Sequence, residues 1–173
     1  MKENSIQSII IRYAILIIFS IGNLWIIYSI FSPLTTHAAY LAIKLFFTDA
    51  FLRGDIINYS NHSLQVISSC VAGAAYLLLL ILNLSTPMKK DQRIKSISFL
   101  IISFFIFNII RITIFAVLFA NNYSSIDALH KFSWYFLSIA FVIILWFTNV
   151  KIFNIKSIPI YSDLRYLYNL AKK

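Results

Sequence analysis

Long apolar stretches alternate with short polar segments along most of this chain. In four places the apolar run is long enough to cross a hydrocarbon layer of ~30 Å as a helix rising about 1.5 Å per residue. The pattern predicts membrane-spanning helices at about residues 6–31, 64–84, 97–120 and 126–150.

The segment between the first two predicted spans has a different character. Residues 34–52 are apolar but include His37, Lys44 and Asp49, a pattern typical of an amphipathic helix lying at the membrane interface. A fifth crossing by this segment is the alternative. Further along, two short β-favouring runs flank the turn-forming residues Ser60-Asn61-His62, which predicts a small hairpin leading into the second span.

These patterns predict an all-α integral membrane protein with a single membrane domain over residues 1–173. It has about four transmembrane helices, with an external interfacial helix and a short β-hairpin-like segment at about residues 34–63. The composition agrees, because 60% of the residues are hydrophobic and only 12% are charged, against about 25% charged in soluble domains. The first apolar stretch exceeds the about 7–15 residues of a signal-peptide core, so we expect it to be retained as a span.

The distribution of basic residues predicts the orientation. The net charge is +9, but the lysines and arginines flank the apolar spans, so we expect membrane lipids rather than nucleic acid as partners. With four spans, one side of the membrane holds most of these charges: Lys2, Arg12, Lys89, Lys90, Arg93, Lys95, Lys151, Lys156, Arg165, Lys172 and Lys173. Because this side is cytoplasmic in most membrane proteins, we expect both termini in the cytoplasm and a location in the cytoplasmic membrane.

Arg111 is the most informative polar residue, because it lies inside the third apolar span. An arginine at mid-membrane depth costs at least ~2.5–3.5 kcal/mol on insertion scales, and such residues usually face a partner or a water-filled cavity. Asn108 lies one turn earlier on the same helix face and is placed to hold the guanidinium. A purely structural pairing of Arg111 with a backbone carbonyl is the simpler interpretation.

Cys70 is the single cysteine of the chain and lies in a run of small residues, Ser68 to Ala75. Such residues allow a helix or a substrate to approach closely, and Gly73 lies one turn further on the same face. Ordinary helix packing around a small apolar cysteine is the alternative.

His130 lies near the start of the fourth span, where Ser124 and Asp127 resemble a helix capping box. Asp127 precedes His130 by one turn and is placed to orient it. His37 and His62 are also expected on the external side and are competing candidates for the same role.

The helix rise brings Cys70, Arg111 and His130 to similar depths, ~9, ~13 and ~6 Å below the outer ends of their spans. All three then lie in the outer half of the membrane on three different helices. A cysteine, a base and a cationic oxyanion donor suit acyl transfer through a thioester. We therefore expect an external-facing site with no metal and no cofactor.

These residues also resemble a known family. A polar lead-in ending in Leu64-Gln65-Val66, then Cys70, then Asn108-Ile109-Ile110-Arg111-Ile112 and finally His130 are similar in order and spacing to the exosortase/archaeosortase family, over roughly residues 53–147. The chain departs from the family directly after the cysteine, where a small residue and then glycine are usual. Here Val71 and Ala72 precede Gly73.

The resemblance implies a sortase-like cysteine transpeptidase with Cys70 as nucleophile, Arg111 as oxyanion stabiliser and His130 as acid and base. Its substrates would be exported proteins that carry a C-terminal motif, a transmembrane helix and a basic tail, and its acceptor a lipid or cell-surface component. Two alternatives remain open. One is a non-catalytic membrane assembly factor or transporter subunit in which Arg111 binds an anion or lipid headgroup. The other is a protein in which Arg111 only pairs structurally.

Overall fold

The computed structural model describes residues 6–21, 24–121 and 125–171. Within these ranges the chain is mostly helical, with one small sheet. The helices are α1 (Ile6–Ile21), α2 (Trp25–Lys44), α3 (Ser68–Val71), α4 (Gly73–Leu84), α5 (Lys90–Ala120), α6 (Ile126–Phe132), the π-helical turn η1 (Ser133–Leu137), α7 (Ser138–Ile152) and α8 (Tyr161–Ala171). The strands are β1 (Phe51–Arg53), β2 (Ile56–Tyr59) and β3 (His62–Gln65).

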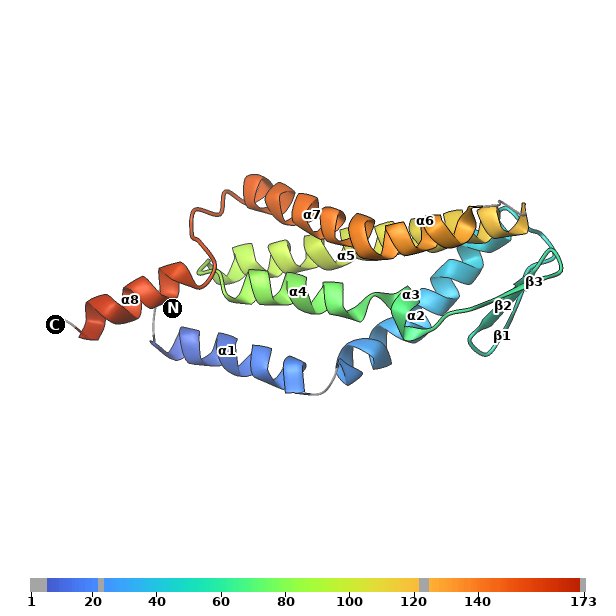
Figure 1. The fold of residues 1–173 in the computed structure, drawn as a ribbon. Coiled ribbons are helices and arrows are strands. Elements are labelled where there is room, and N and C mark those ends of the chain that lie inside the picture. Colours follow the sequence, from blue (N-terminus) through green and yellow to red (C-terminus); the bar gives the residue numbers. More distant parts are fainter. Residues whose placement is uncertain (1–5, 22–23, 122–124, 172–173) are drawn as a thin grey trace.

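Helices α4, α5 and α7 pack against one another as an elongated bundle (Figure 1). Helices α1 and α2 follow the length of this bundle one after the other, α1 against α4 and α2 mainly against α5. The sheet lies at one end, beyond the C-terminal end of α2, and α8 lies at the opposite end (Figure 1).

Among the described residues, three helices are long and apolar enough to cross a membrane: Trp25–Lys44, Lys90–Ala120 and Tyr135–Ile152. The segments Ile6–Ile18 and Ser68–Leu84 are apolar but shorter. Three long apolar helices are compatible with a multi-pass membrane protein, while the predicted number of four spans is not confirmed.

The first predicted span differs from the structure in where it breaks. We expected a span over residues 6–31 and a separate interfacial helix from residue 34, but α2 runs without interruption through Pro33 to Lys44. The break instead lies before Trp25, where Leu24 has a left-handed backbone with φ 63°. Buried residues at four-residue spacing, Thr35, Ala39 and Ile43, pack one face of α2 into the core. This packing outweighs the helix-breaking tendency of Pro33.

The predicted hairpin is present and is extended by a further strand. Strands β2 and β3 pair antiparallel with Tyr59 opposite His62, so the connecting residues are Ser60 and Asn61. Both have positive φ, 43° and 61°, as a two-residue hairpin turn of type I′ requires. Strand β1 adds to β2 through a second tight turn at Gly54, whose φ is 65°. The sheet occupies the start of the predicted second span, which becomes helical only at Ser68.

The inner face of the sheet joins the main core at this end of the bundle. Ile57 and Tyr59 are buried there together with Val71 from α3 and Ala116 from α5. The apolar side chains of the second strand therefore hold the sheet against α2, α3 and α5.

The fourth predicted span, residues 126–150, forms α6, η1 and α7 in succession. A π-helical turn inserts an extra residue into a helix and rotates the faces that follow it. The predicted capping residue Ser124 lies outside the described residues.

A buried polar link fixes the alignment of α4, α5 and α7. The Asn83 side chain donates to Ser96 Oγ at 2.6 Å, and Ser96 donates to Asn149 Oδ1 at 2.9 Å. All three side chains are fully buried, and one comes from each helix. Because breaking such a link leaves buried polar atoms unpaired, it favours one relative position of the three helices.

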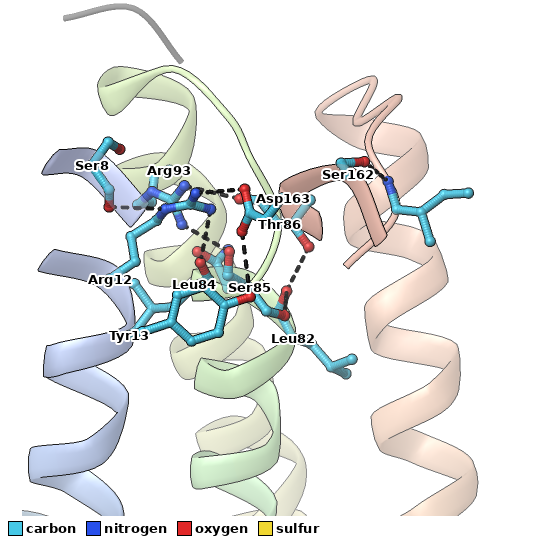
Figure 2. Close-up of polar contacts among 12 residues, drawn as sticks. Ser8, Arg12, Tyr13, Leu82, Leu84, Ser85, Thr86, Arg93, Ser162 and Asp163 are labelled. Atoms are coloured by element: carbon cyan, nitrogen blue, oxygen red, sulfur yellow. Dashed lines mark hydrogen bonds and ion pairs between the residues drawn. The ribbon is translucent and has the colours of Figure 1, made fainter. Parts of the chain in front are cut away.

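Helix α8 was not predicted, and an ion pair holds it to the end of the bundle (Figure 2). Arg12 from α1 contacts Asp163 from α8 at 2.8 Å, and both side chains are buried. The Arg12 guanidinium also donates to the carbonyl oxygen of Leu84 at the end of α4, at 3.1 Å. Arg93 from α5 donates to the carbonyl oxygens of Asn83 and Thr86 alongside. Two arginines expected only as topology signals thus join α1, α4, α5 and α8.

Candidate functional site

Cys70 lies in α3, a single helical turn that ends at Val71. Ala72 follows with φ 57° and ψ 43°, a left-handed conformation, and α4 begins at Gly73. The last carbonyl groups of a helix have no partner within that helix. The break at Ala72 therefore leaves the carbonyl oxygens of Cys70 and Val71 to be bound from elsewhere.

Helix α5 supplies the donors for these carbonyl groups. The Asn108 side-chain amide donates to the Cys70 oxygen at 2.8 Å and to the Val71 oxygen at 3.4 Å. Arg111 Nη2 donates to the same Cys70 oxygen at 3.3 Å. Asn108 and Arg111 share a helix face, as expected from their three-residue spacing. Both side chains converge on the backbone of Cys70. Asn108 therefore holds the turn that carries the cysteine, whereas we expected it to hold the guanidinium.

The guanidinium is held on its other side by the segment around the π-helical turn. Arg111 Nη1 donates to Ser138 Oγ at 2.7 Å, and the Ser138 hydroxyl donates to the carbonyl oxygen of Ser133 at 3.3 Å. Arg111 is thereby fixed between α3 and the first residue of α7, with 9% of its surface exposed. Its described bonds use two of the five N–H donors of a guanidinium.

Cys70 and Arg111 line one small cavity of about 50 Å³. The remaining lining residues come from β3, α3, α5 and η1: Leu64, Ser69, Ile112, Phe115 and Ser133. A single water needs roughly 10–15 Å³ on this measure. The cavity therefore admits a few waters or one small polar group such as a carbonyl, beside both the thiol and the guanidinium.

Two larger apolar grooves flank this cavity. One, of about 260 Å³, lies between α5 and the α6–η1 segment and shares Arg111, Phe115 and Ser133 with the cavity. The other, of about 300 Å³, lies between α4 and the η1–α7 segment and includes Ala75 and Ser138. The first groove therefore places apolar surface directly beside the polar site, while the second is linked to the site through Ser138, which binds Arg111.

Gly73 packs between helices. It is buried, and a Cβ atom at this position would lie 2.7 Å from Cε1 and Cζ of the Tyr28 ring in α2. The absence of a side chain thus allows α2 to approach the start of α4. Gly73 is not among the residues that line the cavity.

His130 and Asp127 lie on α6, one turn and two turns before Ser133. Their side chains are outside the described part of the structure, so the proposed acid and base role stays a prediction. The competing histidines have other contacts. His37 is exposed on α2 with Nδ1 2.8 Å from the Pro33 carbonyl oxygen, and the ring of His62 packs edge-on against Phe119 at 5.0 Å. Neither of these two lines the cavity.

Ser133 and Ser138 were not predicted as site residues from the sequence. They lie five positions apart, which places them on different faces of a regular α-helix. A π-helical turn closes its hydrogen bonds between residues i and i+5 and so brings this spacing together. The two serines that bracket Trp134 to Leu137 were the available signal, but the π-helical turn itself has no simple sequence pattern.

In the parts of the chain that the structure describes, no group of three or more His, Cys, Asp and Glu side chains is placed to hold a metal ion. Searches with protein-family models, against curated proteins and against solved structures found no match to this chain.

Proposed function

We propose that this protein is a membrane-embedded cysteine transpeptidase that cleaves a C-terminal sorting signal of exported proteins through a thioester. The observation that carries the proposal is the shared cavity: Cys70 and Arg111 are 41 residues apart in sequence and belong to different helices, yet they line the same small space. A thiol beside a fixed cation is the arrangement that acyl transfer needs.

In the proposed reaction the Cys70 sulfur adds to the carbonyl carbon of the scissile peptide bond, and the electron pair of the C=O bond moves to oxygen. Arg111 stabilises the oxyanion with N–H groups that its structural bonds leave over. The oxyanion then collapses, the C–N bond breaks, and a thioester forms. The thiol proton passes through His130 to the departing amine. An acceptor nucleophile then attacks the thioester and regenerates the thiol.

The backbone at Ala72 supports the resemblance to the exosortase/archaeosortase family. That family usually has glycine at the second position after the cysteine, which is residue 72 here. Ala72 has φ 57°, a conformation that glycine adopts without strain and other residues adopt rarely. At the position where the family usually has glycine, this chain thus has a backbone conformation that favours glycine.

The proposed orientation follows from the two ends of the bundle. Helix α8 and the α4–α5 turn lie at the end opposite the sheet (Figure 1), and this end carries Lys89, Lys90 and Arg165. Because lysine and arginine favour the cytoplasmic side, the sheet and the cavity face outward in the proposal. Substrates with an apolar C-terminal helix then reach Cys70 along the flanking grooves.

One observation favours a competing function. The described bonds of Arg111 go to the Cys70 carbonyl and to Ser138, which is what a purely structural arginine would also do. In that interpretation the protein is non-catalytic, Arg111 only pairs structurally, and Cys70 is a small packing residue. The two readings differ in what the thiol can do chemically.

The test compares two reactions of the single thiol in the detergent-purified protein. p-Nitrophenyl acetate acylates a thiol through an oxyanion, with release of p-nitrophenol, whereas iodoacetamide alkylates it by direct displacement of iodide. Mass spectrometry follows both at Cys70. Arg111→Lys should slow acylation by about 10²–10³-fold, the loss typical of removing an oxyanion donor, and leave alkylation little changed. Arg53→Lys, at the exposed end of β1, is the matched control.

A parallel fall of both rates in Arg111→Lys would show that Arg111 only maintains the fold. In cells, Cys70→Ala should accumulate an uncleaved precursor of a substrate with a C-terminal helix, at a normal level of the protein itself. Normal processing by Cys70→Ala would overturn the proposed function.

A further inference from the structure

Ser133 is a buried hydroxyl group without a described partner. Its side chain opens the π-helical turn and is 4% exposed, and its Oγ atom has no hydrogen-bond partner among the described residues. Leaving a buried polar group unpaired costs about 1–3 kcal/mol. Such a group in a folded protein therefore calls for an explanation.

The surroundings of Ser133 point to a ligand. Ser133 lines the same cavity as Cys70 and Arg111, and its hydroxyl has no described hydrogen-bond partner. Its backbone carbonyl already accepts the Ser138 hydroxyl, which in turn accepts a bond from Arg111. The bonds that fix Arg111 thus also fix the turn that carries Ser133.

The chemistry of the cavity selects the kind of group that fits. Arg111 only donates hydrogen bonds, and a serine hydroxyl can donate one as well. Two donors beside a nucleophile in about 50 Å³ suit a single carbonyl oxygen, and π-helical turns occur frequently at functional sites.

We infer that the Ser133 hydroxyl is a second donor to the carbonyl oxygen of the acyl substrate, whether peptide or ester. This inference rests on the proposed function and assigns the oxyanion to two groups, a charged one on α5 and a neutral one on η1. When the Cys70 sulfur adds to the carbonyl carbon, the oxygen gains negative charge and both bonds strengthen. The hydroxyl remains protonated throughout the step.

The experiment uses the full-length protein in detergent and the same two probes of Cys70. Ser133→Ala should slow acylation by p-nitrophenyl acetate by about 10²-fold and leave alkylation by iodoacetamide near the wild-type rate. Ser133→Thr, which restores a hydroxyl, should recover most of the acylation rate. Ser98→Ala, which removes an exposed hydroxyl from α5, is the matched control and should change neither rate.

The variants Ser133→Thr and Ser133→Val have side chains of the same shape, but only threonine carries a hydroxyl. Comparing their acylation rates separates loss of the hydroxyl from packing damage, even if the alanine variant fails to fold. Equal acylation rates in the Thr and Val variants would overturn the inference, as would a parallel fall of acylation and alkylation in Ser133→Ala. If Arg111→Lys selectively slows acylation while the serine variants do not, the proposed function stands and only the role of Ser133 fails. If wild-type Cys70 is not acylated at all, both fail together.

Discussion

The side-chain amide of Asn108 donates a 2.8 Å hydrogen bond to the backbone carbonyl of Cys70, across 38 residues of sequence. This bond ties the turn that carries the thiol to α5, which also carries Arg111. The positions of the thiol and the guanidinium therefore depend on one helix face, and a substitution of Asn108 should alter both positions.

Replacing Asn108 by leucine should lower the thermal stability of the purified protein. The substitution leaves the carbonyl oxygen of Val71 without its described side-chain donor and that of Cys70 with Arg111 alone, at a cost of about 1–3 kcal/mol. Thermal unfolding in detergent measures the change. Asn121→Leu is the control, because Asn121 is exposed and its described side-chain bond goes to the carbonyl oxygen of Val117, one turn earlier. Equal melting temperatures for the two variants would show that the bond to Cys70 contributes nothing.

The effect of a substitution at Ala72 on stability should depend on how well the new residue tolerates the left-handed backbone conformation. Glycine removes a strain of about 1–2 kcal/mol, which its greater freedom in the unfolded chain offsets by about 0.4–1 kcal/mol. Ala72→Gly should therefore be neutral or stabilising, and Ala72→Val strongly destabilising. Ala75→Gly, inside α4, should instead cost about 1 kcal/mol. Destabilisation of the same size by both glycine variants in thermal unfolding would contradict the assigned conformation.

Gly73→Ala should destabilise the contact between α2 and α4. The added methyl group would meet the Tyr28 ring at 2.7 Å, and overpacking of this kind typically costs about 1–3 kcal/mol. The double variant Gly73→Ala/Tyr28→Leu should lose less stability than the two single variants added together, because the leucine makes room. Strict additivity of the unfolding free energies would argue that the two residues do not touch.

Breaking the ion pair between Arg12 and Asp163 should release α8 from the bundle (Figure 2). Removal of one partner from a buried ion pair leaves an uncompensated buried charge and typically costs about 3–5 kcal/mol. Asp163→Asn should therefore speed tryptic cleavage after Arg165 in the detergent-solubilised protein. Asp91→Asn changes an exposed aspartate at the start of α5 and is the control. Unchanged protection of α8 in Asp163→Asn would mean that other contacts, such as the bond from Ile160 to Ser85, hold it in place.

Local patterns in the sequence were enough for several features. Apolar runs predicted a helical membrane protein, and the structure has three helices long and apolar enough to span. The turn at Ser60 and Asn61 was predictable because these small polar residues tolerate positive φ. The shared face of Asn108 and Arg111 follows from the helix period alone. Each of these features depends on residues within a few positions of one another.

Tertiary structure decided the rest. Helix α2 continues through Pro33, and beyond it Ala39 and Ile43 pack into a core shared with the sheet and α5. Ser133 joined the cavity through a π-helical turn, and Arg12 found Asp163 across 151 residues. In each case the outcome depends on packing or pairing with a remote part of the chain as well as on a local preference. The apolar pattern of one segment cannot show this outcome, because the free energy of a contact depends on both segments that form it.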